Sequence, residues 1–283
     1  MSELRPLNLP LQSPDGHGYT LLARIPEQPV ASLLWLPALG IAARHYLPFA
    51  EALAARDVAV FLHEWRGIGS SDLRASRTWN WGYRQLLTLD LPTSEAAMLD
   101  ALPEAASGAT RVIGGHSLGG QLACCRLALA PDTARRVWLV ASGAPYWRAF
   151  PPPTRYWLPL VYRFLPWLSD RCGALPGRRI GFGGQEARGL IRDWAATALS
   201  GRYATPEGDV DLDGSMSQLA PAVRAVVLAD DWLAPASSLR FLLSKMPRAR
   251  VSTIELDAQA LGSSADHFGW MKQPARVAEA LLA

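Results

Sequence analysis

Short, uninterrupted runs of apolar residues, rich in Val, Leu and Ala, recur along the chain and end at Gly, Pro or Asp. Continuous runs, as opposed to alternating apolar and polar positions, are typical of strands that are buried on both faces of a parallel sheet. The pattern predicts strands within residues 31–40, 58–65, 110–117, 135–143, 223–231 and 251–260.

Helix-like segments separate these runs. They cover residues 43–56, 93–106 and 118–130, and residues 275–283 form a last predicted helix. Strand followed by helix, repeated in this way, indicates right-handed crossovers within one sheet. We therefore predict an α/β fold with a mostly parallel central sheet flanked by helices.

The rhythm of strand and helix breaks at residues 144–220. An aromatic stretch, YWRAFPPPTRYWLPLVYRFLPWL, is followed by the Gly-rich PGRRIGFGG and by a helix-like segment at 187–200. The aromatic residues are too dense and too irregular for one amphipathic face. We expect a helical cap inserted at 144–220, over a core made of residues 1–143 and 221–283. An apolar cap beside a catalytic loop would shape a pocket; the alternative is a helical layer without a binding role.

Composition narrows the function classes. The 283 residues are 49% hydrophobic and 19% charged, which indicates a folded globular protein with a sizeable core. A net charge of +3, from 28 basic and 25 acidic residues, gives no reason to expect nucleic-acid binding. No signal-peptide pattern and no apolar run of about 18 residues is present, so we expect a cytoplasmic protein without an integral membrane segment.

The three cysteines give neither a disulfide framework nor a zinc-site spacing, and two of them are adjacent. A reducing compartment is the simpler expectation. We predict that they are small buried hydrophobic residues.

The sharpest chemical feature is GGHSLGG at residues 114–120, which fits the motif GxSxG. It stands where a strand pattern changes to a helix pattern, which is the context that this motif requires. Gly115 and Gly119 would allow a tight turn and a close approach of strand and helix, holding the Ser117 hydroxyl at the carboxyl edge of the sheet. The helix N-terminus favours developing negative charge. We predict Ser117 as a nucleophile; the alternative is a glycine-rich turn without catalysis.

A serine nucleophile needs a base in hydrogen-bond reach, and that base must be oriented by a third group. Of the five histidines only His267 follows Ser117 in the chain, and nucleophile, acid, base is the order used in this type of sheet. His267 lies in the polar loop SADHFGW, and we predict it as the base; a surface histidine without a role is the alternative. His116 is predicted to be a packing or turn residue, because neighbouring side chains on a sharp turn diverge.

The acid is predicted at the carboxyl end of the strand in VRAVVLADDWLAP, where ligand-handling residues of open parallel sheets gather. Asp230 and Asp231 are both candidates. We favour Asp231, because Pro235 four residues later resembles the DxxxP spacing of known triads, and keep Asp230 as the alternative. The acid would orient His267 and stabilise its imidazolium form.

The oxyanion of an acyl-transfer intermediate needs backbone donors. One would be the amide of Leu118, directly after the nucleophile, and the other should come from PALG at residues 37–40, after the first predicted strand. Pro37 has no N–H group, so we choose Leu39, with Ala38 second.

These residues together resemble the α/β-hydrolase fold serine hydrolases over nearly the whole chain. Besides GHSLGG, the segment HEWRGIGSSD at residues 63–72 looks like the D-x-RGxGxS turn of that fold, with Glu64 where Asp is usual. More narrowly, SGAPYWRAFPPP, PGRRIGFGG, DDWLAP and DHFGW resemble a bacterial family of predicted serine hydrolases. Two segments depart from the usual pattern: Pro37 and Ala38 replace an HG start of the oxyanion loop, and Asp266 precedes His267 where Gly is frequent.

The expected activity is hydrolysis of a carboxylic ester with an apolar part, through an acyl-enzyme on Ser117. Thioesterase, lactonase, amidase or peptidase, and acyltransferase activities use the same machinery and stay open. A non-catalytic small-molecule binding protein is an alternative of another class. No metal, nucleotide or flavin is implied, since neither GIGSSD nor GFGG completes a phosphate-binding motif. The expected partner is therefore a small ester or acyl substrate.

Overall fold

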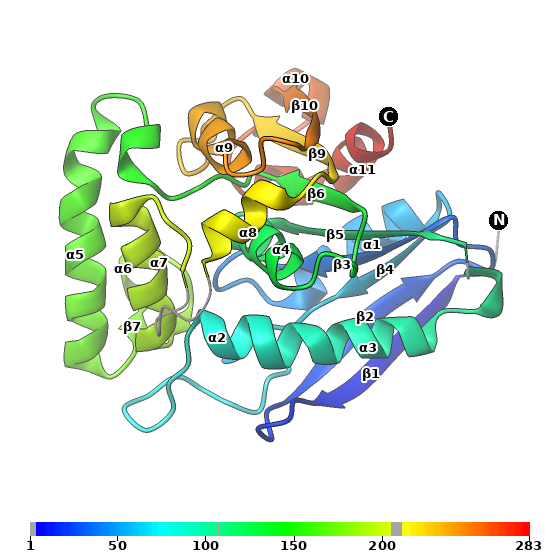
Figure 1. Cartoon of the computed structure of the whole chain (residues 1–283), viewed down its shortest axis with the longest axis horizontal. Helices are drawn as coiled ribbons and strands as arrows, with labels where there is room; N and C mark the ends of the chain where they lie inside the picture. The colour runs from blue at the N-terminus through cyan, green and yellow to red at the C-terminus, as the bar shows by residue number, and fades with distance from the viewer. Residues whose placement is uncertain (1–3, 107, 205–210) are drawn as a thin grey trace.

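A computed structural model describes residues 4–106, 108–204 and 211–283. In this part of the chain, eight strands form one sheet in the order β1-β2-β4-β3-β5-β6-β9-β10 (Figure 1). The strands are β1 (Arg5–Gln12), β2 (Gly18–Ile25), β3 (Ala31–Leu36), β4 (Val58–Leu62), β5 (Thr110–His116), β6 (Arg136–Val140), β9 (Ala222–Leu228) and β10 (Arg250–Leu256). From β4 to β10 every neighbouring pair is parallel. The predicted fold class is confirmed.

The antiparallel pair β1 and β2 is an addition that the apolar runs do not predict. β1 is an edge strand whose residues are exposed or half-buried, and it contains Pro6 and Pro10. β2 alternates half-buried and buried positions. A search for continuous apolar runs misses both strands, because an edge strand such as β1 tolerates proline and an antiparallel strand such as β2 alternates with a period of two.

Helices cover both faces of the sheet. They are η1 (Ala43–Tyr46), α1 (Leu47–Ala54), α2 (Tyr83–Gln85), η2 (Leu86–Asp90), α3 (Leu91–Ala101), η3 (Glu104–Ala106), α4 (Leu118–Leu129), η4 (Trp147–Ala149), α9 (Ala236–Leu243), α10 (Ala258–Leu261), η5 (Gly269–Lys272) and α11 (Pro274–Leu282). The helix expected at 93–106 begins earlier, as the continuous segment α2, η2 and α3, and ends at Ala101. Leu102 is extended because the residue before Pro103 avoids helical geometry.

The two largest hydrophobic clusters of buried residues lie one on each face of the sheet. Successive side chains of β3 alternate between them: Leu34 and Leu36 belong to the cluster of α3 and α4, whereas Leu33 and Trp35 belong to the cluster of α1 and α11. Both clusters are apolar, and this is why the central strands read as uninterrupted hydrophobic runs.

The segment between β6 and β9 adds α5 (Thr154–Cys172), β7 (Leu175–Pro176), α6 (Gly177–Ile180), β8 (Gln185–Glu186), α7 (Arg188–Ser200) and α8 (Leu212–Gln218). Figure 1 shows α5, α6 and α7 standing at one end of the sheet, while α8 lies against α4. We call α5–α7 the helical insertion. The expected cap boundaries, 144 and 220, stay a prediction, and residues 205–210 within them lie outside the described part.

Helix α5 explains the density of aromatic residues in this segment, because two of its faces are apolar. Leu158, Tyr162 and Leu165 are buried toward the protein, whereas Leu160 and Phe164 are exposed. Spacings of three and four residues place each set on its own face of the helix. Within the described residues, no helix is both long and apolar enough to cross a membrane.

The cysteine prediction holds for two residues and is wrong for the third. Cys124 and Cys125 are buried in α4, and burial raises the pKa of the Cys124 thiol to about 12. Cys172 is exposed, because it ends α5 at the surface of the helical insertion.

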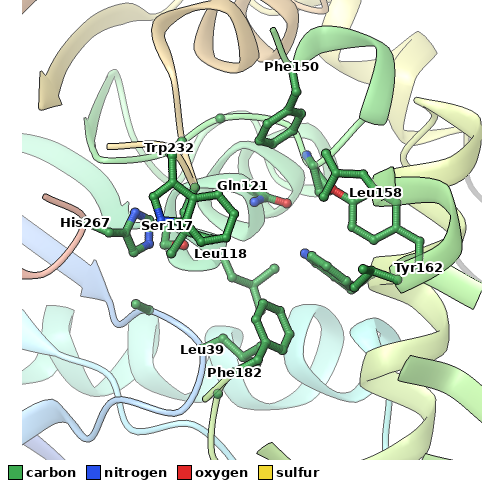
Figure 2. A pocket seen from close by; sticks show the side chains of 18 of the residues that line it. Leu39, Ser117, Leu118, Gln121, Phe150, Leu158, Tyr162, Phe182, Trp232 and His267 are labelled. Carbon is green, nitrogen blue, oxygen red and sulfur yellow. The ribbon is translucent and has the colours of Figure 1, made fainter. Parts of the chain in front are cut away.

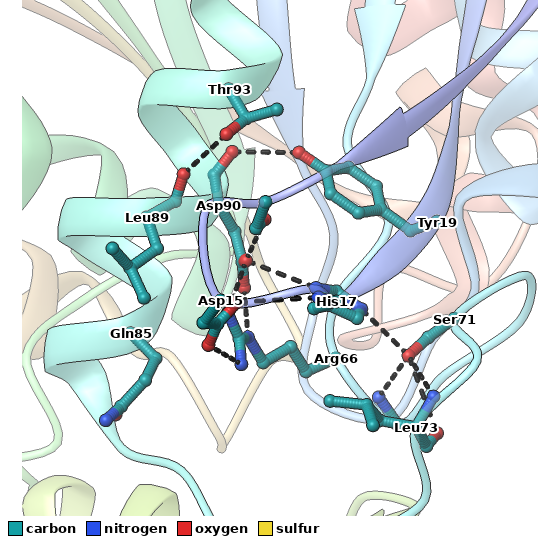
Figure 3. Close-up of polar contacts among 12 residues, drawn as sticks. Asp15, His17, Tyr19, Arg66, Ser71, Leu73, Gln85, Leu89, Asp90 and Thr93 are labelled. Carbon is teal, nitrogen blue, oxygen red and sulfur yellow. Dashed lines mark hydrogen bonds and ion pairs between the residues drawn. The ribbon is translucent and has the colours of Figure 1, made fainter.

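A buried polar network fastens the β1–β2 turn to the rest of the fold (Figure 3). Arg66 lies between two carboxylates, with Nε 2.6 Å from Asp90 Oδ2 and Nη1 2.7 Å from Asp15 Oδ2. His17 bridges Asp90 and Ser71 with its two ring nitrogens, at 3.1 and 3.0 Å. Burial raises the pKa of Asp90, but hydrogen bonds from His17 and Arg66 outweigh it and hold the pKa at about 2. The arginine of the RGxGxS turn therefore has a structural partner in η2.

Candidate active site

Ser117 occupies a sharp turn between β5 and α4. Its backbone has φ 55° and ψ −120°, a combination that residues other than glycine rarely adopt. The turn is held by Ser117 N, which donates to Val140 O at 3.1 Å, and by Ser142 Oγ, which donates to Ser117 O at 2.7 Å. A strained residue at this place is typical of a nucleophile elbow.

The glycines beside Ser117 are required by close backbone contacts. A Cβ atom at Gly115 would lie 2.6 Å from Gly120 N and 2.7 Å from Leu36 O, and one at Gly119 would overlap the Leu36 carbonyl group. Helix α4 therefore packs directly on the ends of β3 and β5. The close approach that the motif predicts is present.

The structure brings His267 to Asp231. His267 Nδ1 lies 2.7 Å from Asp231 Oδ2, and both side chains are buried. Asp231 Oδ1 accepts hydrogen bonds from Leu233 N at 2.9 Å and Ala234 N at 3.0 Å, so the carboxylate is oriented by its own loop. Asp230 is exposed and lies outside this arrangement. Of the two candidate acids, only Asp231 is placed to orient His267.

Ser117 and His267 line one pocket, and Figure 2 shows their side chains next to each other. His267 comes from the loop after α10, held by Asp266 Oδ1, which accepts from Phe268 N at 3.0 Å and Gly269 N at 2.8 Å. With Nδ1 facing Asp231, the other ring nitrogen of His267 is the one available to Ser117. The three predicted residues thus gather from β5, β9 and the last loop at one edge of the sheet.

The two expected oxyanion donors also line this pocket. Leu118 begins α4 and Leu39 lies in the loop after β3. Within the described residues, neither backbone N–H donates to a protein acceptor. Ala38 N instead donates to Tyr46 Oη at 2.9 Å, so the second choice for the donor is already engaged. Of the two candidates in PALG, Leu39 is the one whose N–H remains available.

His116 connects three loops of the site. Its Nε2–H donates to the backbone carbonyl of His267 at 2.9 Å, and its Nδ1 accepts from Tyr46 Oη at 2.9 Å. Tyr46 in turn accepts from Ala38 N. Burial, and then the proximity of His267, lowers the pKa of His116 well below its ordinary value, so the ring stays neutral. Sequence reasoning treated His116 as a packing or turn residue, and no local signal reveals this role, because its partners are distant in the chain.

Glu64, which stands where aspartate is usual in the family, is buried and joins two segments. Its Oε1 accepts from Ala43 N at 2.9 Å, and its Oε2 accepts from Ser70 N at 3.0 Å. The longer side chain therefore spans from the turn after β4 to the start of η1.

The Gly-rich segment PGRRIGFGG reaches the oxyanion loop. Gly40 has φ +77°, and a Cβ atom at this position would overlap the backbone of Gly183 and Gly184. Glu186 Oε1 accepts from Gly184 N at 2.6 Å and is buried. The helical insertion therefore supports the loop that carries Leu39.

Glu186 predicts a pH dependence of stability. Burial raises its pKa from 4.5 to about 7. The folded state binds the proton of the Glu186 carboxyl group more tightly than the unfolded chain does. The contribution of this proton to the free energy of unfolding is therefore complete below about pH 4.5 and is lost as the pH rises through about 7. Glu186→Gln keeps the bond to Gly184 and cannot ionise. We expect the variant to gain up to about 3 kcal/mol at alkaline pH and nothing at acid pH.

Thermal unfolding followed by circular dichroism at a series of pH values measures this effect. Glu104→Gln, which removes an exposed carboxylate, is the control for loss of charge alone. Parallel pH curves for Glu186→Gln and wild type would contradict the prediction.

The pocket wall is predominantly apolar and comes from both the sheet edge and the helical insertion. Its aromatic members are Phe150, Trp157, Tyr162, Phe182, Trp194, Trp232 and Phe268. In the described part of the chain, the residues that line this pocket include no Asp, Glu, Lys or Arg. Such a wall suits an uncharged, apolar group of a substrate.

Among the described residues, no group of three or more His, Cys, Asp or Glu side chains is placed to hold a metal ion. The arrangement of a strained serine, a histidine paired with a buried carboxylate and two available amides suits acyl transfer.

Comparison with known proteins gives a family match over most of the chain. The model of a family described as serine aminopeptidase, S33, matches residues 27–246. No curated protein matches in sequence.

Solved structures with the same architecture share little sequence with this chain. An esterase from Exiguobacterium antarcticum is 13% identical with a TM-score of 0.62, covering 98% of each chain. A thioesterase domain from the curacin biosynthetic pathway is 17% identical with a TM-score of 0.56, covering 100% of each chain. A deformylase from Pseudomonas putida is 19% identical with a TM-score of 0.56, covering 99% of this chain and 100% of that one. At these identities the likeness shows the fold.

Proposed function

The chain belongs to the serine aminopeptidase S33 family of α/β hydrolases. We propose that it cleaves a carboxylic ester with an apolar part through an acyl-enzyme on Ser117. The observation that supports this most is the pair of His267 and buried Asp231, 2.7 Å apart, in the same apolar pocket as Ser117.

The reaction proceeds in two acyl transfers. Ser117 Oγ attacks the ester carbonyl carbon while His267 Nε2 accepts the hydroxyl proton, and Asp231 stabilises the imidazolium through its bond to Nδ1. The backbone amides of Leu118 and Leu39 donate to the oxyanion. His267 then gives its proton to the departing alcohol oxygen. Water, activated by His267, attacks the acyl-enzyme and releases the acid and free Ser117.

An ester fits this pocket better than a peptide with a free amino terminus. Recognition of an α-ammonium group calls for a carboxylate or several acceptors, because an unpaired buried charge is costly. The described residues that line the pocket supply no carboxylate. The apolar wall instead suits an uncharged acyl or alcohol part.

Ester, thioester and amide substrates share the chemical step, and the structural relatives include an esterase, a thioesterase domain and a deformylase. The fold therefore does not choose between them. The choice of an ester over an amide rests on the uncharged pocket and on the lower barrier to expelling an alcohol than an amine. A panel of substrates decides between an ester and a thioester.

A matched substrate panel tests the proposal. Wild-type protein is assayed with p-nitrophenyl esters from acetate to long acyl chains, together with a thioester and an anilide of the preferred acyl group. We expect the highest kcat/KM for an ester of intermediate or long chain. A strongly preferred thioester or anilide would replace the ester assignment.

A fluorophosphonate probe on the same preparation, with the adduct located by mass spectrometry, separates two kinds of failure. Labelling of Ser117 without ester turnover would mean an active nucleophile with a different substrate. Absence of both labelling and turnover would overturn the enzyme assignment in favour of a small-molecule binding protein.

A further inference from the structure

Gln121 is a buried polar residue on the pocket side of α4. It follows Ser117 by four residues, so both side chains lie on the same face of the turn that begins the helix. Only 5% of its surface is exposed, and it lines the pocket. In Figure 2 the Gln121 side chain lies beyond Ser117 as seen from His267.

Of the two polar atoms of the Gln121 amide, only the oxygen Oε1 has a hydrogen-bond partner among the described residues. Tyr203 Oη donates to Gln121 Oε1 at 3.3 Å. Tyr203 is itself fixed, because its backbone N donates to Asp213 Oδ1 at 3.0 Å and Asp213 Oδ2 lies 2.6 Å from Lys245 Nζ. This contact assigns the oxygen of the amide to Tyr203 and leaves the NH2 group free to turn to the pocket. No acceptor for Gln121 Nε2 occurs among the described residues.

The surroundings of this amide are apolar. Phe150, which precedes the helical insertion, and Leu158 and Tyr162 of α5 line the same part of the pocket in Figure 2. Gln121 Nε2 is not one of the fully buried, unpartnered side-chain atoms of the described residues, so it reaches the pocket space. An acceptor on a ligand would take the place of water at this donor. A few placed polar groups in an apolar wall typically set the orientation and specificity of a ligand.

The position of His267 relative to Ser117 indicates which part of the substrate, the alcohol or the acyl group, lies beside Gln121. His267 must protonate the departing alcohol oxygen, so the alcohol lies on the His267 side of Ser117. The acyl group then extends to the opposite side, where Gln121 lies (Figure 2). Four residues, about 6 Å of helical rise, separate the two side chains along α4, so the matching acceptor lies several bonds from the scissile carbonyl.

We propose that Gln121 is a specificity-determining residue that donates a hydrogen bond to an acceptor oxygen, such as a ketone or ether oxygen, carried partway along the apolar acyl chain of the substrate. The proposal rests on the assignment of the pocket to an acyl ester. It narrows the substrate class from plain fatty acyl esters to oxygenated acyl esters.

Kinetics with matched substrates test the subsite. The substrates are p-nitrophenyl heptanoate and its analogues with a ketone oxygen at successive chain positions. The wild type is expected to prefer one ketone position over the plain ester by about tenfold in kcat/KM, a typical value for one neutral hydrogen bond. Gln121→Met keeps the length of the side chain without its donor and should abolish this preference, which is measured as the ratio of kcat/KM for the ketone ester to kcat/KM for the plain ester on the same variant.

Two further variants define the cause. Gln218→Met, at an exposed glutamine of α8, is the matched control and should keep the wild-type preference. Tyr203→Phe removes the contact that orients the amide and should reduce the preference partly. Equal use of plain and ketone esters by the wild type, or an unchanged preference in Gln121→Met, would refute the proposal.

Binding to Ser117→Ala separates this proposal from the proposed function. The uncleaved esters serve as ligands, and quenching of tryptophan fluorescence gives their dissociation constants, because Trp157, Trp194 and Trp232 line the pocket. We expect about tenfold tighter binding of the preferred ketone ester, lost in Ser117→Ala/Gln121→Met. If the wild type proved inactive and its serine unlabelled, the catalytic assignment would fail, while these constants would still decide the subsite.

Discussion

Ser117→Ala is expected to lower kcat for ester hydrolysis by about a million-fold, the effect seen when a triad serine is removed. The physical reason is that no acyl-enzyme can form, and water must attack the ester directly. Residual catalysis would come from the oxyanion donors Leu118 and Leu39 and from binding alone. Fluorophosphonate labelling should disappear in the same variant.

Initial rates at saturating substrate, with active sites counted in the wild type by titration, measure this loss. Ser200→Ala removes the same atom from an exposed serine at the end of α7, outside the pocket, and should leave kcat unchanged. Thermal unfolding should show Ser117→Ala as folded, because only one oxygen is lost. A decrease smaller than about a hundredfold would show that another group carries the reaction.

Asp231→Asn is expected to lower kcat by about 10⁴-fold with little change in the fold. Asparagine can keep the bonds from Leu233 N and Ala234 N to its oxygen. Its NH2 group would then face His267 Nδ1, where it can only donate. The imidazole would be held in the wrong tautomer, with its proton on the nitrogen that must accept one from Ser117.

The neighbouring carboxylate supplies a matched control. Asp230→Asn changes an exposed side chain one residue away and should alter kcat by less than about threefold. Comparison of kcat for the two variants, with thermal unfolding as a check on the fold, decides which aspartate orients the base. A large loss in Asp230→Asn with an active Asp231→Asn would reverse the assignment.

The fold was predictable where the local pattern reflects the whole environment of an element. The central strands lie between two apolar clusters, so their residues are hydrophobic without interruption, and this can be read from the chain alone. Strands β1 and β2 were missed because the edge strand β1 is exposed or half-buried and contains prolines, and β2 follows a period of two. Their attachment depends on Arg66 and Asp90, whose partners are far away in the chain.

The candidate site divides in the same way. By itself, the sequence determined the motif around Ser117, the chain order that singles out His267 and the two aspartates after one strand, since each is a short-range feature. Only the tertiary structure placed Asp231 against His267, engaged Ala38 with Tyr46 and turned half of the Gln121 amide to an apolar pocket. These outcomes depend on which distant side chain satisfies each buried polar group, and that is decided when the elements pack together.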